Sequence, residues 1–292
     1  MDTIQQLISL FPYAIAGSIL AGIICSFLGT FVVSQRVVFL GAVLTQVAIA
    51  GVAFSFLHLI NLEGFLTSIT GLDLENTSWL HHYEPVVFSL IFALATVLIF
   101  SQTHHQKLLT QDSVLGIIFV VAIAARIMFI QKSPVADVAE VESILKGDIL
   151  FIGQRELITL AVILIFVMMI FTIYQKQFKF VTFDPESASA HGINSKKWLL
   201  IFYFVVGIGI SLTTRFVGDV FAFAFLIIPP SIGILIAKKV KNVFLISILV
   251  GAIIPPVAIY IAFKYDFSSG PTAVVSAFIL FLVVFLVKKV KG

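Results

Sequence analysis

The sequence predicts an all-α polytopic membrane protein with about nine transmembrane helices. Of its 292 residues, 60% are hydrophobic and only 11% are charged, and the mean hydropathy is +1.14. A water-soluble domain of this length cannot bury so much apolar surface. The apolar residues form runs of roughly 17–25, the length that an α-helix needs to cross a hydrocarbon core about 30 Å thick. These runs are continuous and do not alternate apolar with polar residues, which favours spanning helices over the strands of a barrel.

Charged residues, prolines and glycines divide the chain into nine candidate spans. In chain order they are 13–34, 37–60, 85–101, 114–130, 157–175, 198–214, 217–237, 243–263 and 271–287. Eight spans remain possible if either 85–101 or the short 198–214 does not cross the membrane. No soluble domain interrupts the series, so we expect residues 1–292 to form one transmembrane domain.

Basic and acidic residues alternate between successive connections. The odd-numbered connections and the C-terminus hold twelve of the 18 Lys and Arg residues: Arg36, Lys107, Lys176, Lys179, Lys196, Lys197, Lys238, Lys239, Lys241, Lys288, Lys289 and Lys291. Two even-numbered connections are acidic and hold Glu63, Asp73, Glu75, Glu84, Asp137, Glu140, Glu142 and Asp148. The positive-inside rule then places the N-terminus outside and the C-terminus in the cytoplasm. Because the basic residues lie at helix ends, the net charge of +3 does not indicate a nucleic-acid partner.

A polar segment, residues 176–197, separates two of the apolar runs and includes the stretch FDPESASAHGINSKKW. Asp184 suits a helix N-cap, Pro185 the first turn, Glu186 the positive end of the dipole, and Gly192 the C-terminal end. The pattern predicts about two turns of cytoplasmic helix over 184–192. An isolated helix this short is marginal in water. We therefore expect it either to rest on neighbouring spans or to dock a soluble partner.

The stretch FDPESASAHGI resembles the cytoplasmic coupling segment of ABC importer permeases of the zinc/manganese/iron family, whose pattern is close to F-D-P-E-x-A-x-x-x-G-I. Further stretches resemble the same family in the same order: QRVVFLGAVLTQVAIAGVA (35–53), DSVLGIIF (112–119), VGDVFAFAFLIIPPSIGILIA (217–237) and YDFSSGPTAVV (265–275). Together they extend over most of the chain. The resemblance implies the ABC importer permease fold in a multi-pass protein of a bacterial or archaeal cytoplasmic membrane.

The resemblance also implies a function, the import of a divalent metal cation (zinc, manganese or iron) by alternating access. Besides membrane lipid, it implies three partners: a cytoplasmic ATP-binding subunit, an extracytoplasmic metal-binding protein, and a second permease chain, in a homodimer or with a paired permease. Asp184, Pro185, Glu186, Ala188 and Gly192 would contact the ATPase. The chain has no G-x-x-x-x-G-K-[ST] P-loop, so we expect ATP and Mg²⁺ in a separate subunit and no enzymatic activity here. A stand-alone secondary transporter or channel, or an ABC permease for a non-metal cargo, is the alternative.

The second span, 37–60, holds the polar residues nearest the predicted midplane. Gln46 lies about nine residues into this span, beside Thr45, at about 1.5 Å of rise per residue. Ala42 and Ala50 are small, which permits close helix approach in a membrane. The polar pair either bonds neighbouring helices together or lines the translocation pathway. His58, near the outer end, is the histidine best placed to lie on that pathway.

This span departs from the family pattern at its metal site. Family members often carry an acidic residue and a histidine four apart, as in G-D-x-x-x-H-A, which places a carboxylate and an imidazole on one helix face. This chain has Ala42 and Gln46 at those positions. Alanine offers no ligand and glutamine one carbonyl oxygen, so the family's metal site cannot be carried over and the metal ligands stay unknown.

Two charges fall inside apolar runs, Arg126 in 114–130 and Asp219 in 217–237. An unpaired charge at the centre of a spanning helix costs about 2.5–3.5 kcal/mol on insertion scales. We expect Arg126 and Asp219 to lie at similar depth and to form a structural pair, with Arg215 as the competing partner of Asp219. The alternative role for Asp219 is to gate the pathway or attract cations.

Overall fold

The computed structural model describes residues 7, 9–57, 78–103, 110–133, 149–183 and 194–291. Nine helices within these ranges are long and apolar enough to cross a membrane, which confirms the all-α, multi-span prediction. They are α2 (Pro12–Ser34), α3 (Val38–Ser55), α5 (Ser78–Thr103), α6 (Gln111–Lys132), α8 (Gln154–Ile173), α11 (Ser195–Val217), α12 (Asp219–Ile236), α13 (Val240–Tyr265) and α14 (Ser269–Lys291). The described residues also include two short elements, the 3-10 helix η1 (Ile149–Phe151) and the helix α9 (Gln175–Phe183).

Both spans whose crossing was in doubt are full-length helices. The run 85–101 lies within the 26 residues of α5, and 198–214 lies within the 23 residues of α11. Apolar content marks only the part of a helix inside hydrocarbon, whereas the helix continues into polar residues that cap it. At the start of α11, for example, the Asn194 side chain accepts a hydrogen bond from the Lys197 amide at 3.2 Å. The span 37–60 is corrected the other way, because α3 ends at Ser55 and the chain turns at 56–57.

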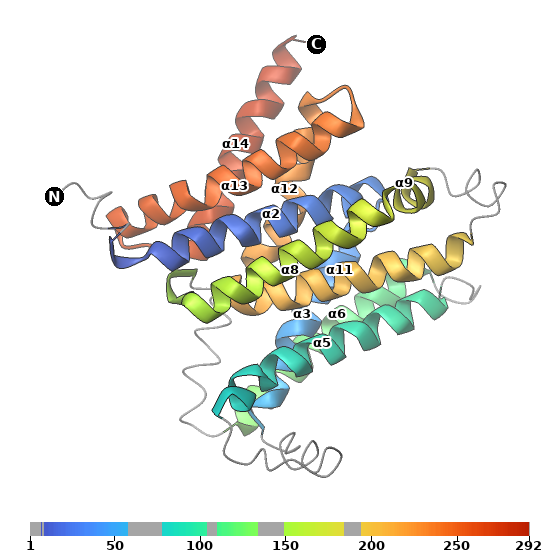
Figure 1. The fold of residues 1–292 in the computed structure, drawn as a ribbon, viewed down its shortest axis with the longest axis vertical. Helices are drawn as coiled ribbons and strands as arrows, with labels where there is room; N and C mark the ends of the chain where they lie inside the picture. The colour runs from blue at the N-terminus through green and yellow to red at the C-terminus, as the bar shows by residue number, and fades with distance from the viewer. Residues whose placement is uncertain are drawn as a thin grey trace.

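Helix α2 lies at the centre of one group of helices and packs against α13, α12, α8 and α11. In Figure 1, α2, α8 and α11 run side by side across the view, and α13 and α14 are drawn above α2. The crossing of α2 and α13 is close because Gly22 faces Gly251: a Cβ atom added at either glycine would collide with the backbone carbonyl of the other. Small residues allow such backbone contact between spanning helices.

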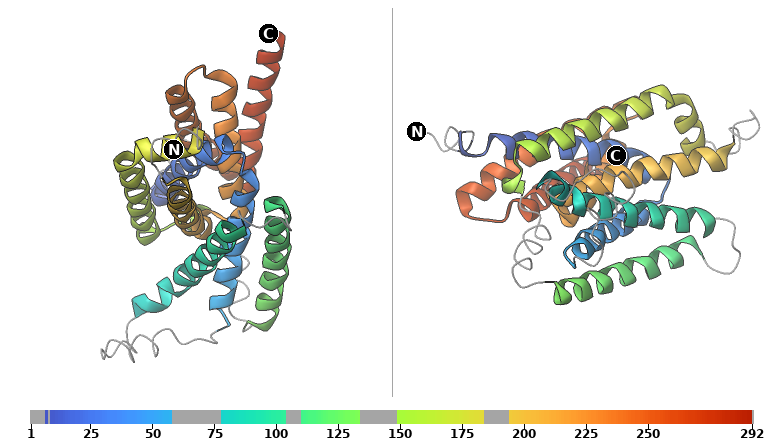
Figure 2. Two further views of the ribbon diagram at one scale, coloured as in Figure 1. Left: turned by 90° about the vertical axis from the view of Figure 1, so that its right-hand side faces the viewer. Right: turned by 60° about the horizontal axis from the view of Figure 1, so that its bottom comes forward.

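Helix α3 lies between α5 and α6 and packs closely on both, as Figure 2 shows. The small residues expected to permit close approach do so on the α5 side, since a Cβ atom at Gly51 would lie 2.6 Å from the Phe88 carbonyl oxygen. Helix α3 also contacts α11 and α12, and it thereby joins this trio to the α2-centred group.

A single residue, Gly218, separates α11 from α12. Its backbone has φ 81° and ψ 164°, a region that is essentially restricted to glycine. The Gly218 amide donates to the Thr214 carbonyl at 2.8 Å, and Asp219 is the first residue of α12. This one-residue turn therefore determines where the Asp219 carboxylate lies.

Candidate translocation pathway

Three polar side chains from three spanning helices meet inside the protein. Gln46 of α3 donates through Nε2 to Asp219 Oδ2 of α12 at 2.8 Å. Arg126 of α6 donates through one guanidinium nitrogen to Gln46 Oε1 at 3.2 Å and to Asp219 Oδ2 at 3.4 Å. The three residues form a closed ring of hydrogen bonds, which we call the Gln46–Arg126–Asp219 cluster.

The charged side chains of the cluster are largely shielded from solvent, so each is stabilised by pairing with the other. The side chain of Asp219 is 10% exposed and that of Arg126 is 22% exposed. The second carboxylate oxygen of Asp219 also has a donor, the Val220 amide at 2.8 Å. A buried charge is tolerated when it is paired and hydrogen-bonded, and both conditions hold for Asp219 here.

Two members of the cluster, Gln46 and Asp219, form part of the wall of a cavity of about 260 Å³. Ala42, Thr45, Gln46 and Asp219 line it, together with Phe119 of α6 and neighbours on α12 and α14. Three of the polar or small residues singled out on the second span therefore share one cavity with Asp219. Thr45 is buried, and its hydroxyl donates to the Ala42 carbonyl at 2.9 Å within the same helix.

The structure places the remaining candidate residues elsewhere. Ala50 is buried among packed helices and is not part of the cavity wall. Among the described residues the ion pair of Asp219 is with Arg126 rather than with Arg215, whose guanidinium carbon lies 5.9 Å from the centre of the Phe216 ring. His58 and the coupling residues lie outside the described residues, and the latter are Asp184, Pro185, Glu186, Ala188 and Gly192.

In the part of the chain that the structure describes, no three His, Cys, Asp or Glu side chains gather where they could hold a metal ion. At the cavity, Asp219 supplies the carboxylate, and Gln46 supplies the amide. Their oxygen atoms suit a hard or borderline divalent cation that passes through, but both side chains are bonded to Arg126 in this conformation.

The approach to the coupling segment contains an element that sequence analysis missed. Within the segment 176–197, residues 176–183 belong to α9 and 195–197 to the first turn of α11. Helix α9 buries Phe178, whose ring lies 4.7 Å from that of Phe171, and its Thr182 hydroxyl accepts a hydrogen bond from Gln35 Nε2 at 3.0 Å. The spacing of the apolar residues at 178 and 181 was the available signal.

Comparison with known proteins identifies the chain's family. Residues 8–288 match the sequence model of the family described as the ABC 3 transport family. The chain belongs to the ABC 3 transport family. A manganese transport system membrane protein of Listeria monocytogenes is 23% identical over 96% of this chain and 91% of its own length. A probable iron transport system membrane protein of Haemophilus influenzae is 23% identical over 91% of this chain and 85% of its own length.

A solved structure has the same fold as this ABC 3 family member. PsaBC from Streptococcus pneumoniae in complex with Fab contains a chain that superposes with a TM-score of 0.76. The superposition covers 97% of this chain and 94% of that one at 21% identity, a likeness that shows the fold alone. The predicted resemblance to ABC permeases is therefore confirmed for both family and fold. With nine apolar helices in its described residues alone, the chain is a multi-pass protein of the bacterial cytoplasmic membrane.

Proposed function

We propose that this chain is the permease subunit of an ATP-driven importer of a divalent transition-metal cation. The names of its relatives favour manganese or iron over zinc. The observation that carries the proposal is the buried Gln46–Arg126–Asp219 cluster beside a cavity in a chain of this family. A carboxylate at a junction of three spanning helices is a suitable contact for a cation that crosses between them.

In this mechanism Arg126 acts as a tethered cation. Its guanidinium neutralises Asp219 and occupies the Gln46 carbonyl oxygen, so the cluster offers no unoccupied carboxylate while it is closed. A metal ion that reaches Asp219 has to replace this guanidinium. Alternating access then corresponds to separating α6 from α3 and α12, which would expose Asp219 only when the cavity opens.

The coupling segment would drive this motion through α9. Residues 184–192 directly follow α9, and α9 is hydrogen-bonded through Thr182 to Gln35, three residues before α3 begins. A displacement of the coupling segment by the ATPase would therefore move the start of the helix that carries Gln46. We assign ATPase contact to Asp184, Pro185, Glu186, Ala188 and Gly192, a role that their sequence pattern supports.

The same proposal includes the partners and the orientation. ATP and Mg²⁺ would bind to a separate cytoplasmic subunit, and an extracytoplasmic metal-binding protein would deliver the ion. The membrane unit would be a dimer, either of this chain or of this chain and a related permease. The N-terminus would lie outside and the C-terminus inside, as the distribution of basic residues supports.

Reconstitution of the chain with its proposed ATP-binding and metal-binding partners tests the proposal. We expect ATP-dependent uptake of manganese or iron. The Glu186→Lys variant should lose both uptake and copurification of the ATPase, because the charge reversal falls in the segment proposed to contact the ATPase. The Asp112→Lys variant is the matched control: it reverses an exposed carboxylate in the first turn of α6 and should keep both. Metal uptake by the chain without ATP would instead support a stand-alone transporter.

A further inference from the structure

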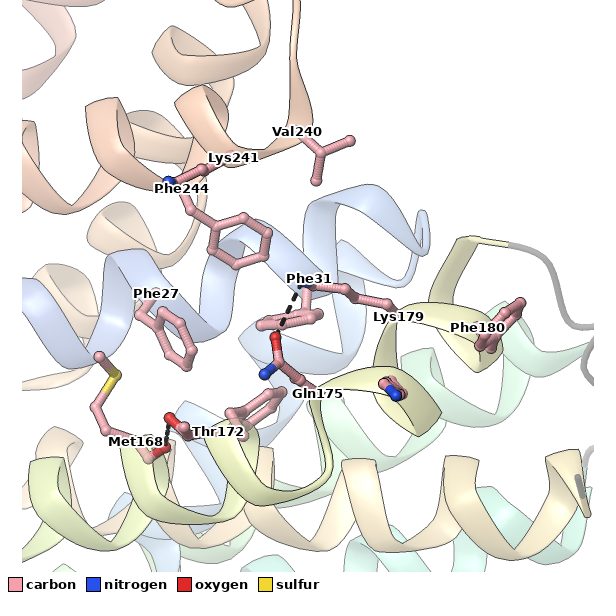
Figure 3. A pocket seen from close by; sticks show the side chains of 12 residues that line it. Phe27, Phe31, Met168, Thr172, Gln175, Lys179, Phe180, Val240, Lys241 and Phe244 are labelled. Atoms are coloured by element: carbon pink, nitrogen blue, oxygen red, sulfur yellow. Dashed lines mark hydrogen bonds between the residues drawn. The ribbon is translucent and has the colours of Figure 1, made fainter.

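A second, larger cavity, between α2, α8, α9 and α13, shares no lining residue with the first. Its volume is about 730 Å³, and its walls are aromatic, with Phe27 and Phe31 of α2, Phe171 of α8 and Phe244 of α13. The centre of the Phe31 ring lies 4.5 Å from the centre of the Phe171 ring and 4.7 Å from that of the Phe244 ring, so the rings form one continuous wall. Figure 3 shows Phe27, Phe31 and Phe244 turned toward the same space, which we call the aromatic groove.

Three lysines lie at the rim of the aromatic groove, Lys176 and Lys179 of α9 and Lys241 of α13. All three are exposed. The Lys179 ammonium donates to Gln175 Oε1 at 3.3 Å, as Figure 3 shows. Among the described residues no carboxylate forms an ion pair with any of the three lysines. The rim therefore carries positive charge that this part of the chain does not neutralise.

The sides of the groove are continuous with the lipid-facing surface. Exposed apolar side chains flank it on α8, such as Ile173, and on α13, such as Leu245 and Leu249. The lysines, in contrast, lie at helix ends: Lys241 is the second residue of α13, and α9 follows directly after α8 ends. Aromatic walls within the hydrocarbon region and cations at its edge match the two parts of a phospholipid.

We propose that the aromatic groove is a binding site for an anionic phospholipid, with its phosphate among the three lysines and an acyl chain against the phenylalanine rings. Basic pockets between spanning helices bind anionic headgroups in this way. A second protein copy in the groove would have to bury three lysines, which is unfavourable without acidic partners. The assignment to the cytoplasmic leaflet rests on the orientation proposed above, whereas the site itself rests on the groove.

The site would place a lipid directly on the element that leads to the coupling segment. Helix α9 supplies two of the three lysines and ends where residues 184–192 begin. It also carries Thr182, which bonds to Gln35 before α3. A bound phosphate would hold α9 against α13, so lipid composition would influence how ATP hydrolysis is coupled to transport.

Native mass spectrometry of the purified complex, loaded with phosphatidylglycerol or with phosphatidylcholine, measures this binding. We expect preferential retention of phosphatidylglycerol. Each lysine contributes roughly fivefold to attraction of an anionic surface, so Lys176→Gln, Lys179→Gln and Lys241→Gln together should weaken retention by up to about 100-fold. The control, Lys238→Gln, Lys239→Gln and Lys289→Gln, removes the same charge from exposed lysines that do not line the groove. It should keep the lipid.

A second pair of variants tests the apolar part of the site. Thr172→Trp should fill the groove and displace the lipid, whereas Val162→Trp should not, since Thr172 and Val162 are both exposed on α8 but only Thr172 lines the groove. Equal retention of the two lipids, or equal loss in both lysine triples, would overturn the proposal. So would a Thr172→Trp variant that dissociates the permease dimer or the ATPase yet retains phosphatidylglycerol, because the groove would then hold protein. Excess inorganic phosphate should not displace the lipid. Uptake assays on the wild type test the transport function separately.

Discussion

Removing the two charges of the cluster, singly and together, tests whether Arg126 and Asp219 act as one unit. Arg126→Gln leaves the Asp219 carboxylate with the neutral donors Gln46 Nε2 and the Val220 backbone amide. Asp219→Asn leaves a guanidinium inside the protein without its counter-charge. The double variant removes both charges and keeps hydrogen-bonding groups of similar size. We expect the double variant to be more stable than the sum of the single effects implies.

The expected coupling follows from the geometry. At 3.4 Å and an effective dielectric constant of about 20, two unit charges attract by about 5 kcal/mol. Partial exposure of Arg126 and the desolvation of both groups reduce this value, so we expect a coupling energy of about 2–3 kcal/mol. Each single variant should lose about 3 kcal/mol of unfolding free energy, because it leaves one charge buried and unpaired. The double variant should lose about as much as one single variant, not twice as much.

Reversible unfolding of the purified protein in bicelles, by steric trapping, gives the four free energies of this cycle. A matched control cycle combines Arg126→Gln with Asp112→Asn, which lies near the start of the same helix and is exposed. The control should be additive to within about 0.5 kcal/mol. If the Arg126–Asp219 cycle is equally additive, the two residues are not energetically paired, and the tethered-cation mechanism loses its basis.

Three further perturbations address the turn, the link to α9 and the metal site. Gly218→Ala should cost about 1–3 kcal/mol of unfolding free energy through backbone strain, whereas Gly116→Ala, which meets open space, should not destabilise; similar losses would contradict this. Thr182→Val removes one hydrogen bond worth about 1 kcal/mol and should lower the metal moved per ATP hydrolysed; an unchanged ratio would refute the link. Ala42→Asp with Gln46→His should raise metal content by elemental analysis, because it restores a carboxylate and an imidazole four residues apart; unchanged metal content would refute this.

The helical fold could be predicted because a bilayer leaves few alternatives. Continuous apolar runs had to be helices, and their number follows from the charges between them. The helix ends could not be predicted equally well. The helix α5 begins seven residues before the apolar run at 85–101, because a helix continues past the hydrocarbon while its polar ends are capped. Helix α9 was missed because an amphipathic helix of nine residues has too few apolar positions to stand out between two spans.

The residues of the candidate site could be predicted from the sequence better than the hydrogen bonds that join them. Arg126 and Asp219 were expected to pair because a charge in an apolar run needs a partner. Gln46 was singled out separately, as a polar residue on a small-faced helix. That Gln46 bonds to both charges depends on how α3, α6 and α12 pack, and no sequence spacing encodes that packing. The one-residue turn at Gly218, which determines the position of Asp219, likewise becomes visible only with its backbone angles.

The bonded cluster also bears on the departure at Ala42 and Gln46 from the family pattern that this sequence resembles. A permanent acid–histidine pair would hold a cation in the membrane whether or not the transporter turns over. Here the carboxylate comes from α12 and its charge is neutralised by Arg126 from α6. In the proposed mechanism, access of a cation to Asp219 would depend on helix movement rather than on ligand strength. Gln35 and Thr182 connect α9 to the start of α3, the helix that carries Gln46. In the proposed mechanism, the residues that would admit the ion and the segment that would bind the ATPase are therefore linked through α9 and α3.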